Sequence, residues 1–168
     1  MTSPLDLPLK ATMFECVSNP RGKPITLSLR EFERMVRDTR AKRKDLLPLI
    51  SFFRFRDNHR SNANALRFSA ITLDYDGESV PLKEGAEKFR AAGLSALLHE
   101  TASSKRDAPR WRAILPVSEP LPVASYAAMV ARANGLLGGI LAPESFTPAQ
   151  QYFVGHVRER GACPITLT

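Results

Sequence analysis

The chain has 168 residues, a length typical of one domain, and its hydrophobic share of 43% is enough for an ordinary core. No apolar run approaches the length needed to span a membrane, so we expect a soluble, cytoplasmic protein without a membrane partner. The formal net charge of +7 favours negatively charged partners such as nucleotides or nucleic acid. The two cysteines, Cys16 and Cys163, lie far apart and at no metal-ligand spacing, which indicates reduced thiols.

The first third of the chain predicts one strand and one basic helix. Residues 1–10 are Pro-rich and predict little order, whereas residues 12–17 predict a strand. Ser28 and Glu31 have the spacing of a capping box, which predicts that a helix begins there. The helix runs into a group of cations: Arg37, Arg40, Lys42, Arg43 and Lys44. These cations suit either the negative end of the helix dipole or a phosphate backbone, and the sequence favours neither.

The central stretch of the chain is a strand that ends in two carboxylates. The apolar run at residues 49–55 predicts a strand and leads, through a polar and basic segment at residues 54–65, into residues 67–78. In the last of these stretches the side chains alternate as in a β-strand, up to Asp74 and Asp76. Because residues i and i+2 of a strand point the same way, we expect both carboxylates to leave one face together.

The chemistry of this Asp-x-Asp-Gly stretch favours a metal site. Two adjacent carboxylates repel each other unless a cation lies between them. Oxygen ligands of this kind suit Mg²⁺ or Mn²⁺, above all where substrate phosphates complete the coordination shell. The alternative is an acidic turn that caps the strand and is solvated and inert, because so short a motif also occurs by chance.

Residues 68–101 predict a β-α-β unit. Pro81 lies near the start of a helix that Gly93 ends, and a strand follows at residues 94–101. A crossover of this kind usually lays its second strand parallel to the first in the same sheet.

The loop at residues 101–112 is rich in hydroxyl groups and cations, and it leads into a predicted strand at residues 111–117. The candidate phosphate ligands in this loop are Ser103, Ser104, Lys105, Arg110 and Arg112. Beside a pair of carboxylates they suit a triphosphate, because cations and metal ions share the phosphate charge. The alternative is a solvated basic hairpin.

The last part of the chain predicts one more helix and one more strand. The prolines at residues 120–122 are expected to break the chain, and Ser125 is expected to cap a helix that stops at Gly138. A segment that contains Glu144 precedes the last predicted strand, residues 151–157.

Taken together and in order, four short stretches resemble the motifs of the primase-polymerases of phages and plasmids, a branch of the archaeo-eukaryotic primase superfamily. These stretches are Leu73 to Asp76, Thr101 to Ser104, Pro109 to Pro116 and Glu144 to Phe146. The resemblance covers about residues 24–155. It implies an α/β fold with an RRM-like mixed sheet flanked by helices, which is the catalytic core that makes or extends nucleic-acid primers on a template.

The resemblance implies a role for each motif. Asp74 and Asp76 carry the first motif, as ligands of Mg²⁺ or Mn²⁺. In the second motif Ser103 matches, and Ser104 stands where the family's histidine is expected. Glu144 is the nearest acid for the third motif and would be a further metal ligand. The triphosphate would be held by the loop cations Lys105, Arg110 and Arg112. The template backbone would follow Arg40, Arg43, Arg54, Arg56 and Arg60.

The reaction that the resemblance implies is nucleotidyl transfer with two divalent ions, from nucleoside triphosphates, on a single-stranded DNA template. The implied setting is the DNA replication of a phage or plasmid, with a replicative helicase as a further partner. We expect residues 1–168 to form a single catalytic domain, of the kind found at the N-terminal end of a longer replication protein.

Three other interpretations stay open. The first is a catalytically silent nucleic-acid-binding module on the same scaffold, which Ser104 in place of histidine favours. The second is a phosphatase of the haloacid dehalogenase type, which needs a further acidic pair, whereas this chain has no aspartate after Asp107. The third is a metal or nuclease site formed by His59, His99 and His156, no two of which lie at ligand spacing.

Overall fold

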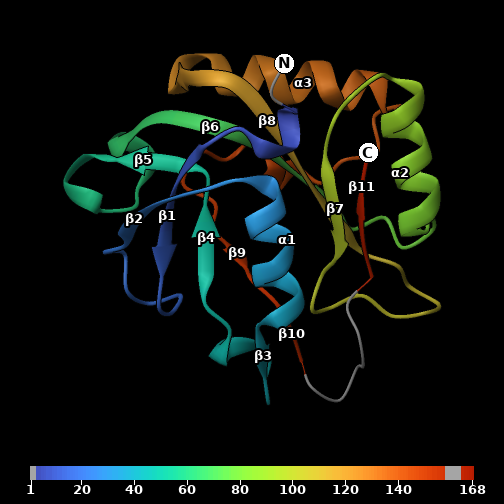
Figure 1. Ribbon diagram of the computed structural model, residues 1–168, viewed down its shortest axis with the longest axis horizontal. Helices are drawn as coiled ribbons and strands as arrows, with labels where there is room; N and C mark the ends of the chain where they lie inside the picture. The colour runs from blue at the N-terminus through green and yellow to red at the C-terminus, as the bar shows by residue number, and fades with distance from the viewer. Residues whose placement is uncertain (1–2, 158–163) are drawn as a thin grey trace.

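The computed structural model describes residues 3–157 and 164–168 of the chain (Figure 1). Its helices are α1 (Leu29–Asp38), α2 (Leu82–Ala91) and α3 (Tyr126–Leu136). Its strands are β1 (Leu9–Phe14), β2 (Lys23–Leu27), β3 (Arg40–Ala41), β4 (Leu49–Ser51), β5 (Phe53–Phe55), β6 (Ala65–Tyr75), β7 (Leu97–Glu100), β8 (Trp111–Pro122), β9 (Tyr152–Phe153), β10 (His156–Val157) and β11 (Ile165–Leu167). A short 3₁₀ helix at Pro143–Phe146 follows α3. None of the helices within these ranges is both long and apolar enough to cross a membrane.

The strand that leads to the two aspartates, β6, lies inside a five-stranded sheet with the order β11-β7-β8-β6-β5. β8 pairs antiparallel with both β6 and β7, so β6 and β7 run parallel with β8 between them. The predicted β-α-β unit is therefore present, because β6, α2 and β7 follow one another and the two strands share a sheet and a direction. The insertion of β8 places its first residues directly opposite the last residues of β6.

A second sheet is antiparallel and has the order β2-β1-β4-β9. The single strand predicted over residues 49–55 is wrong, because the chain changes sheets at Phe52. β4 pairs with β1, whereas β5 pairs with β6. Phe52 packs with the residues around α1, and Phe53 packs in the cluster on the other face of the five-stranded sheet. Both halves of the apolar run are buried, so the sequence pattern alone does not reveal the division.

The last strand predicted from the sequence, residues 151–157, is also divided. β9 pairs with β4, whereas β10 pairs with β3. Gly155 lies between them with a φ of 95°, and a Cβ at this position would lie 2.3 Å from the carbonyl oxygen of Thr39. Glycine fits this crowded, left-handed position, where it redirects the chain from one sheet to the other. β11 is a further strand that the sequence pattern did not predict.

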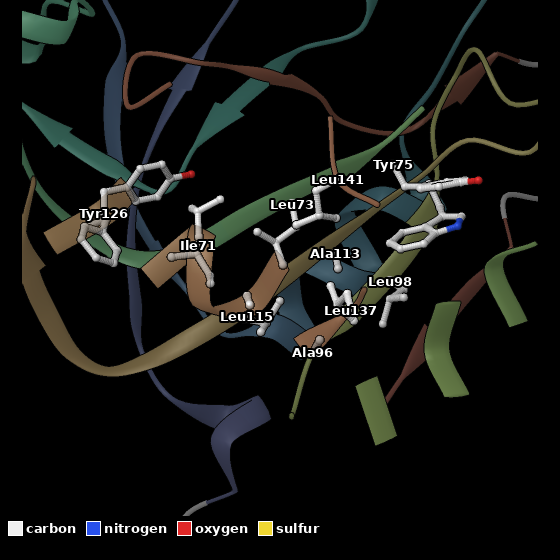
Figure 2. Packing of buried hydrophobic residues seen from close by; sticks show 14 of the residues in the cluster. Ile71, Leu73, Tyr75, Ala96, Leu98, Ala113, Leu115, Tyr126, Leu137 and Leu141 are labelled. Carbon is white, nitrogen blue, oxygen red and sulfur yellow. The ribbon is translucent and has the colours of Figure 1, made fainter. Parts of the chain in front are cut away.

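Two hydrophobic clusters cover the two faces of the five-stranded sheet. On one face, Ile71 and Leu73 of β6 belong to a cluster that also contains Tyr126 of α3 (Figure 2). Buried side chains of α2 belong to the same cluster. On the other face, Ala70 of β6 packs with Phe32 of α1 and with side chains of the second sheet. Because successive side chains of a strand alternate between faces, Asp74 leaves the same face as Ala70, toward α1 and the second sheet.

Local signals predicted some helix ends and missed others. Ser28 Oγ accepts a hydrogen bond from Glu31 N (3.2 Å), and the Glu31 side chain accepts one from Ser28 N, so the capping box is confirmed. Ser125 makes no capping bond, because it lies in a 3₁₀ turn that precedes α3. The predicted break at the prolines is also wrong, because β8 continues to Pro122, opposite Arg67. β7 pairs with β8 only up to Ile114, so among the described residues the edge of β8 that faces away from β6 is unpaired at Pro120 and Pro122. A proline removes no ladder hydrogen bond at that edge.

The boundaries near the N-terminus also differ from the prediction. The predicted lack of order at residues 1–10 is wrong in part, because Pro4–Asp6 forms a 3₁₀ turn and β1 begins at Leu9. α1 ends at Asp38, so Arg40 belongs to β3 rather than to the helix. The cations that follow the helix therefore lie on a separate segment, and Lys44 of this segment lines the same cavity as Asp74 and Asp76.

Candidate functional site

Asp74 and Asp76 stand at the end of β6 and line one cavity of about 210 Å³, called the first cavity below. Asp74 is inside the strand and only 6% exposed, whereas Asp76 lies beyond the strand and is exposed. Five other segments contribute lining residues: the 3₁₀ helix with Glu144, the loop at residues 101–103, the start of β8 with Arg110 and Arg112, the segment at residues 150–153 that contains β9, and the segment after α1 with Lys44. The cavity therefore brings together residues that are far apart along the chain.

Asp74 has a positively charged partner, because Arg112 lies directly opposite it on β8. Arg112 Nε is 2.6 Å from Asp74 Oδ1. Counting side-chain atoms alone, Arg112 is 12% exposed and Asp74 is 9% exposed. The guanidinium also lies over the Tyr152 ring, 4.2 Å from its centroid. Directly opposed residues of an antiparallel pair leave the same face of the sheet, so the register itself creates this ion pair. Arg112 thus neutralises one of the two aspartates within the fold.

His99 on β7 lies opposite Arg112 on the other side and continues this row across the sheet. Its ring is buried, and its Nδ1 is 2.9 Å from the carbonyl oxygen of Glu100. Burial first, and then the positive charge of Arg112, lower the pKa of His99 to about 3. His99 therefore stays neutral near pH 7, and the charge of Arg112 is matched by Asp74.

The segment that carries Glu144 is held against the backbone of Asp74. Ala142 N donates to Asp74 O (2.8 Å), and Asp74 N donates to Ser145 Oγ (2.9 Å). Ser145 is fully buried. Ser145 belongs to the stretch from Glu144 to Phe146 that resembles a family motif, but the sequence predicted a role only for Glu144, because the contact of a serine with a distant backbone has no spacing signature. The two bonds fix the 3₁₀ helix beside β6, which places Glu144 in the lining of the first cavity.

Three carboxylates, those of Asp74, Asp76 and Glu144, therefore line one cavity. In its chemistry this all-oxygen donor set fits Mg²⁺ or Mn²⁺. Within residues 3–157 and 164–168, no three or more His, Cys, Asp or Glu side chains are grouped so that they could hold a metal ion. The three carboxylates thus share the lining of one cavity without forming such a group, and among the described residues His59, His99 and His156 form no such group either.

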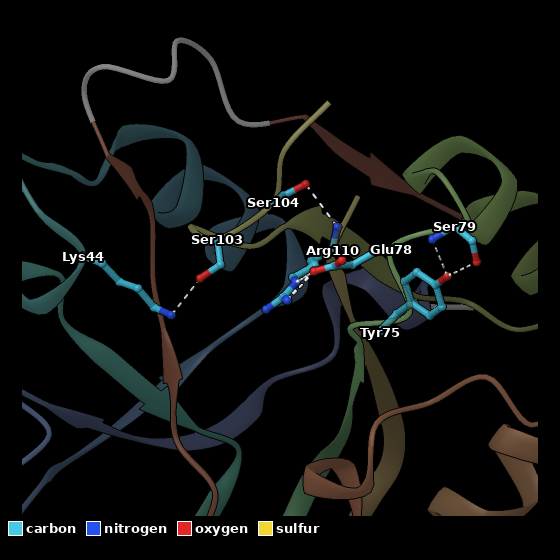
Figure 3. Close-up of polar contacts among 7 residues, drawn as sticks. All are labelled: Lys44, Tyr75, Glu78, Ser79, Ser103, Ser104 and Arg110. Atoms are coloured by element: carbon cyan, nitrogen blue, oxygen red, sulfur yellow. Dashed lines mark hydrogen bonds and ion pairs between the residues drawn. The ribbon is translucent and has the colours of Figure 1, made fainter. Parts of the chain in front are cut away.

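Ser103 and Ser104 lie in the loop that joins β7 to β8, called the hairpin loop, and they make different contacts (Figure 3). Ser103 lines the first cavity, and its Oγ accepts a hydrogen bond from Lys44 Nζ (2.9 Å). Ser104 is buried, and its Oγ accepts a hydrogen bond from the backbone N of Arg110 (3.1 Å). Ser104 therefore stabilises the conformation of the hairpin loop, and it is not among the described residues that line the first cavity. Of these two serines, Ser103 is therefore the one that lines the cavity.

Lys44 is a site residue that sequence reasoning did not single out. Its ammonium lies 5.1 Å from the centre of the Phe153 ring and contacts Ser103 in the hairpin loop. Lys44 also lines a second, adjoining cavity of about 560 Å³. The cationic residues of this second cavity are Arg43, Lys44, Lys105 and Arg110. The only sequence signal was the basic run after α1, which does not say what those cations face.

The residues predicted to hold a triphosphate are divided between the two cavities. Arg112 lines the first cavity, Lys105 lines the second, and Arg110 lines both. Arg110 also forms an ion pair with Glu78, which lines the second cavity. The basic loop and the diacid strand are therefore adjacent, as their combination in the sequence predicted.

The residues predicted to contact the template backbone differ in exposure and in their contacts with the rest of the protein. Arg40, Arg43 and Arg56 are exposed, and Arg43 lines the second cavity. Arg54 is half-buried on β5. Arg60 is turned toward the protein, where its Nη1 donates to a carbonyl oxygen before β9 (3.1 Å). Arg60 therefore contributes to the packing of the loop that precedes β6.

Sequence comparison gives one family. The family model described as the VapE N-terminal domain matches residues 12–141, which is most of the chain. Among curated proteins, none matches the sequence.

Solved structures resemble the fold at low sequence identity. The AEP domain of the primase-polymerase of cyanophage S-2L has a TM-score of 0.53 and 18% identity, over 94% of this chain and 79% of that chain. The polymerase domain of Mycobacterium tuberculosis ligase D, in complex with DNA, has a TM-score of 0.46 and 12% identity, over 90% and 69%. The first likeness confirms the predicted fold, an α/β primase-type core with helices flanking a mixed sheet. It leaves the phosphatase interpretation without structural support.

Proposed function

The chain belongs to the VapE N-terminal domain family, and from that premise we propose that it is a nucleotidyltransferase of the primase-polymerase kind. It would add nucleotides, from nucleoside triphosphates, to a primer on a single-stranded DNA template. The observation that carries the proposal is that three carboxylates and a group of cations line two adjoining cavities. Acidic and basic groups in this arrangement are what phosphoryl transfer requires.

The acidic side of the site would bind divalent ions. Asp74, Asp76 and Glu144 are the residues that would hold Mg²⁺ or Mn²⁺. When bound, such an ion supplies charge neutralisation for phosphates and lowers the pKa of a hydroxyl. Arg112 is better suited to orienting Asp74 than to holding a triphosphate, because its guanidinium is mostly buried against Asp74 and Tyr152.

The basic side of the site would bind the triphosphate. Arg110 and Lys105 carry positive charge into the second cavity, and Lys44 lies at the boundary between the two cavities. The Lys44 ammonium and the Ser103 hydroxyl are already in contact, so both groups are in position before a phosphate arrives. Charge-assisted hydrogen bonds from such groups are the stronger kind in proteins.

The exposed cations Arg40, Arg43 and Arg56 would contact the template backbone. Such binding releases counterions, so the affinity for the template would fall as salt is added. A larger share is expected from these residues than from Arg60, whose guanidinium is already bonded to the protein. We place the domain in phage or plasmid replication, as part of a longer replication protein or beside a replicative helicase that exposes the template.

Two observations favour a second candidate, a nucleic-acid-binding module without catalysis. Asp74 is neutralised by Arg112, and the carboxylates of the described residues form no cluster of three. A module of this kind would bind single-stranded DNA on the same surface and would leave nucleotides unchanged.

Nucleotide incorporation separates the two candidates. A primed single-stranded DNA template, labelled nucleoside triphosphates and either Mg²⁺ or Mn²⁺ are incubated with the wild-type protein, and template binding is measured on the same preparation. Incorporation that requires a divalent ion supports the nucleotidyltransferase. Template binding without incorporation under either ion establishes the silent module, and the absence of both contradicts both candidates.

A further inference from the structure

The second cavity contains an anion that belongs to the protein itself. Among the described residues that line it, four are cationic and one, Glu78, is a carboxylate. Arg110 Nε lies 2.8 Å from Glu78 Oε1, and Arg110 Nη2 contacts the same oxygen (Figure 3). A guanidinium that grips a carboxylate in this way presents the same donors to a phosphate. The position of the Glu78 carboxylate therefore marks where an external anion can bind.

Glu78 is held in this position by a strained loop. Its φ of 58° lies in the left-handed region, which residues other than glycine rarely adopt. The loop folds over Tyr75, whose hydroxyl accepts hydrogen bonds from Ser79 N (3.0 Å) and Val80 N (2.9 Å). The Tyr75 ring in turn stacks on Trp111, with centroids 4.8 Å apart. A rigid aromatic pair thus supports a backbone conformation that directs a carboxylate toward Arg110.

The surroundings suit an anion larger than one carboxylate. Lys105 and Arg43 line the same cavity as Arg110, and Lys44 connects it to the cavity of the three carboxylates. The side chains of Arg110 and Glu78 are 35% and 45% exposed, so solvent weakens their ion pair. A ligand with several negative charges can contact more than one of these cations at once, which the single Glu78 carboxylate does not do.

We infer that, in the second cavity, the terminal phosphates of a polyphosphate replace the Glu78 carboxylate on Arg110. The inference rests on the proposed function, because it names the place where the triphosphate of the substrate would end. Glu78 then acts as an internal competitor that lowers the affinity for anions while the cavity is empty of ligand. Lys44, which the sequence motifs do not include, becomes one of the phosphate ligands.

The test is calorimetric titration of inorganic tripolyphosphate in metal-free buffer at fixed ionic strength. Glu78→Gln removes the competing charge, so the affinity should rise by up to about five-fold, the size expected for an exposed ion pair. Lys44→Gln and Arg110→Gln should both lower the affinity. Glu119→Gln is the matched control, because it removes the same charge at an exposed position on β8 that is not in the lining of either cavity.

A second variant guards against a folding artefact. Glu78→Gly also removes the carboxylate and relieves the left-handed backbone, so it should fold and raise the affinity as Glu78→Gln does. An affinity that is unchanged or lower in both Glu78 variants would overturn the inference. The readout needs neither a divalent ion nor nucleotide incorporation. A higher affinity in these variants without any incorporation would leave the inference standing and count against the proposed function alone.

Discussion

Asp74 and Arg112 occupy directly opposed positions on β6 and β8, and their side chains form a mostly buried ion pair of 2.6 Å. The ion pair alters the electrostatic balance expected for the two aspartates. From the sequence, Asp74 and Asp76 are neighbours that repel each other until a metal ion arrives. In the folded chain Arg112 already neutralises Asp74, so the loss of Asp74 should not relieve repulsion but should leave a buried guanidinium without its partner.

Double-mutant analysis should detect this ion pair. Asp74→Asn and Arg112→Met should each lower the free energy of unfolding by about 3 kcal/mol, because each leaves the other charge uncompensated. The double variant should lose clearly less than the sum of the two, because no uncompensated charge remains. Urea denaturation of the four proteins measures the coupling. Losses that simply add would show that the two side chains do not stabilise each other.

Metal binding should depend on Arg112. In the Arg112→Met variant, Asp74 is free of its protein counter-charge, so Mn²⁺ should raise the melting temperature more than it does in the wild-type protein. The control is Arg112→Met combined with Asp74→Asn, in which the extra effect should disappear. Thermal unfolding with and without Mn²⁺ gives the result. Equal shifts in the wild-type protein and in Arg112→Met would speak against competition between Arg112 and a metal ion.

The free energy of unfolding should depend on pH because His99 is buried in its neutral form. The pKa of His99 is lowered from 6.5 to about 3, so between these values the unfolded chain binds a proton that the folded chain does not. The stability is therefore complete above pH 6.5 and falls as the pH drops toward 3. Between about pH 7.5 and about pH 5.5, the wild-type protein should lose about 1.4 kcal/mol more than His99→Leu does. Chemical denaturation at both pH values measures the difference, and equal losses would contradict the burial of a neutral His99.

Two glycines should respond to alanine in opposite directions. Gly155→Ala places a Cβ 2.3 Å from Thr39 O at a φ of 95°, so it should destabilise the protein by more than about 2 kcal/mol. Gly135→Ala is the control, because a Cβ there meets nothing within 4 Å and the residue lies inside α3. It should stabilise the protein by about 0.5–1 kcal/mol. A Gly155→Ala protein as stable as the wild type would contradict the crossing of the chain between the two sheets.

The sequence predicted what depends on short spacing. The capping box of Ser28 and Glu31, the strand β6 and the position of Asp74 and Asp76 at or just beyond its end are local properties, and the structure contains all three. The resemblance added the order of the motifs, from which the fold followed. These features need no knowledge of which strands become neighbours.

What the sequence did not predict depends on register and on contacts between distant segments. Arg112 reaches Asp74 because β8 inserts between β6 and β7, and the loop pattern does not specify that insertion. Lys44 reaches Ser103 because the segment after α1 passes beside the hairpin loop. Ser104 matched a motif position, but its side chain bonds to the Arg110 backbone, since the fold of the loop decides which serine lines the cavity. The apolar pattern predicted one strand over residues 49–55 and one over residues 151–157, but each is divided, at Phe52 and at Gly155. The residues on both sides of a change of sheet can be equally apolar, so hydrophobicity does not reveal the division.

Single-turnover nucleotide incorporation tests whether Asp76 and its neighbours form a catalytic metal site. Asp76 is exposed and lies beyond the strand, so Asp76→Asn should leave both the fold and template binding unchanged. We expect the wild-type protein to extend a primer in the presence of Mn²⁺ and Asp76→Asn to be slower by about 100-fold or more. Glu119→Gln should extend at the wild-type rate. An Asp76→Asn protein that extends the primer as fast as the wild type, or a folded wild-type protein that binds the template and extends nothing, would contradict the claim.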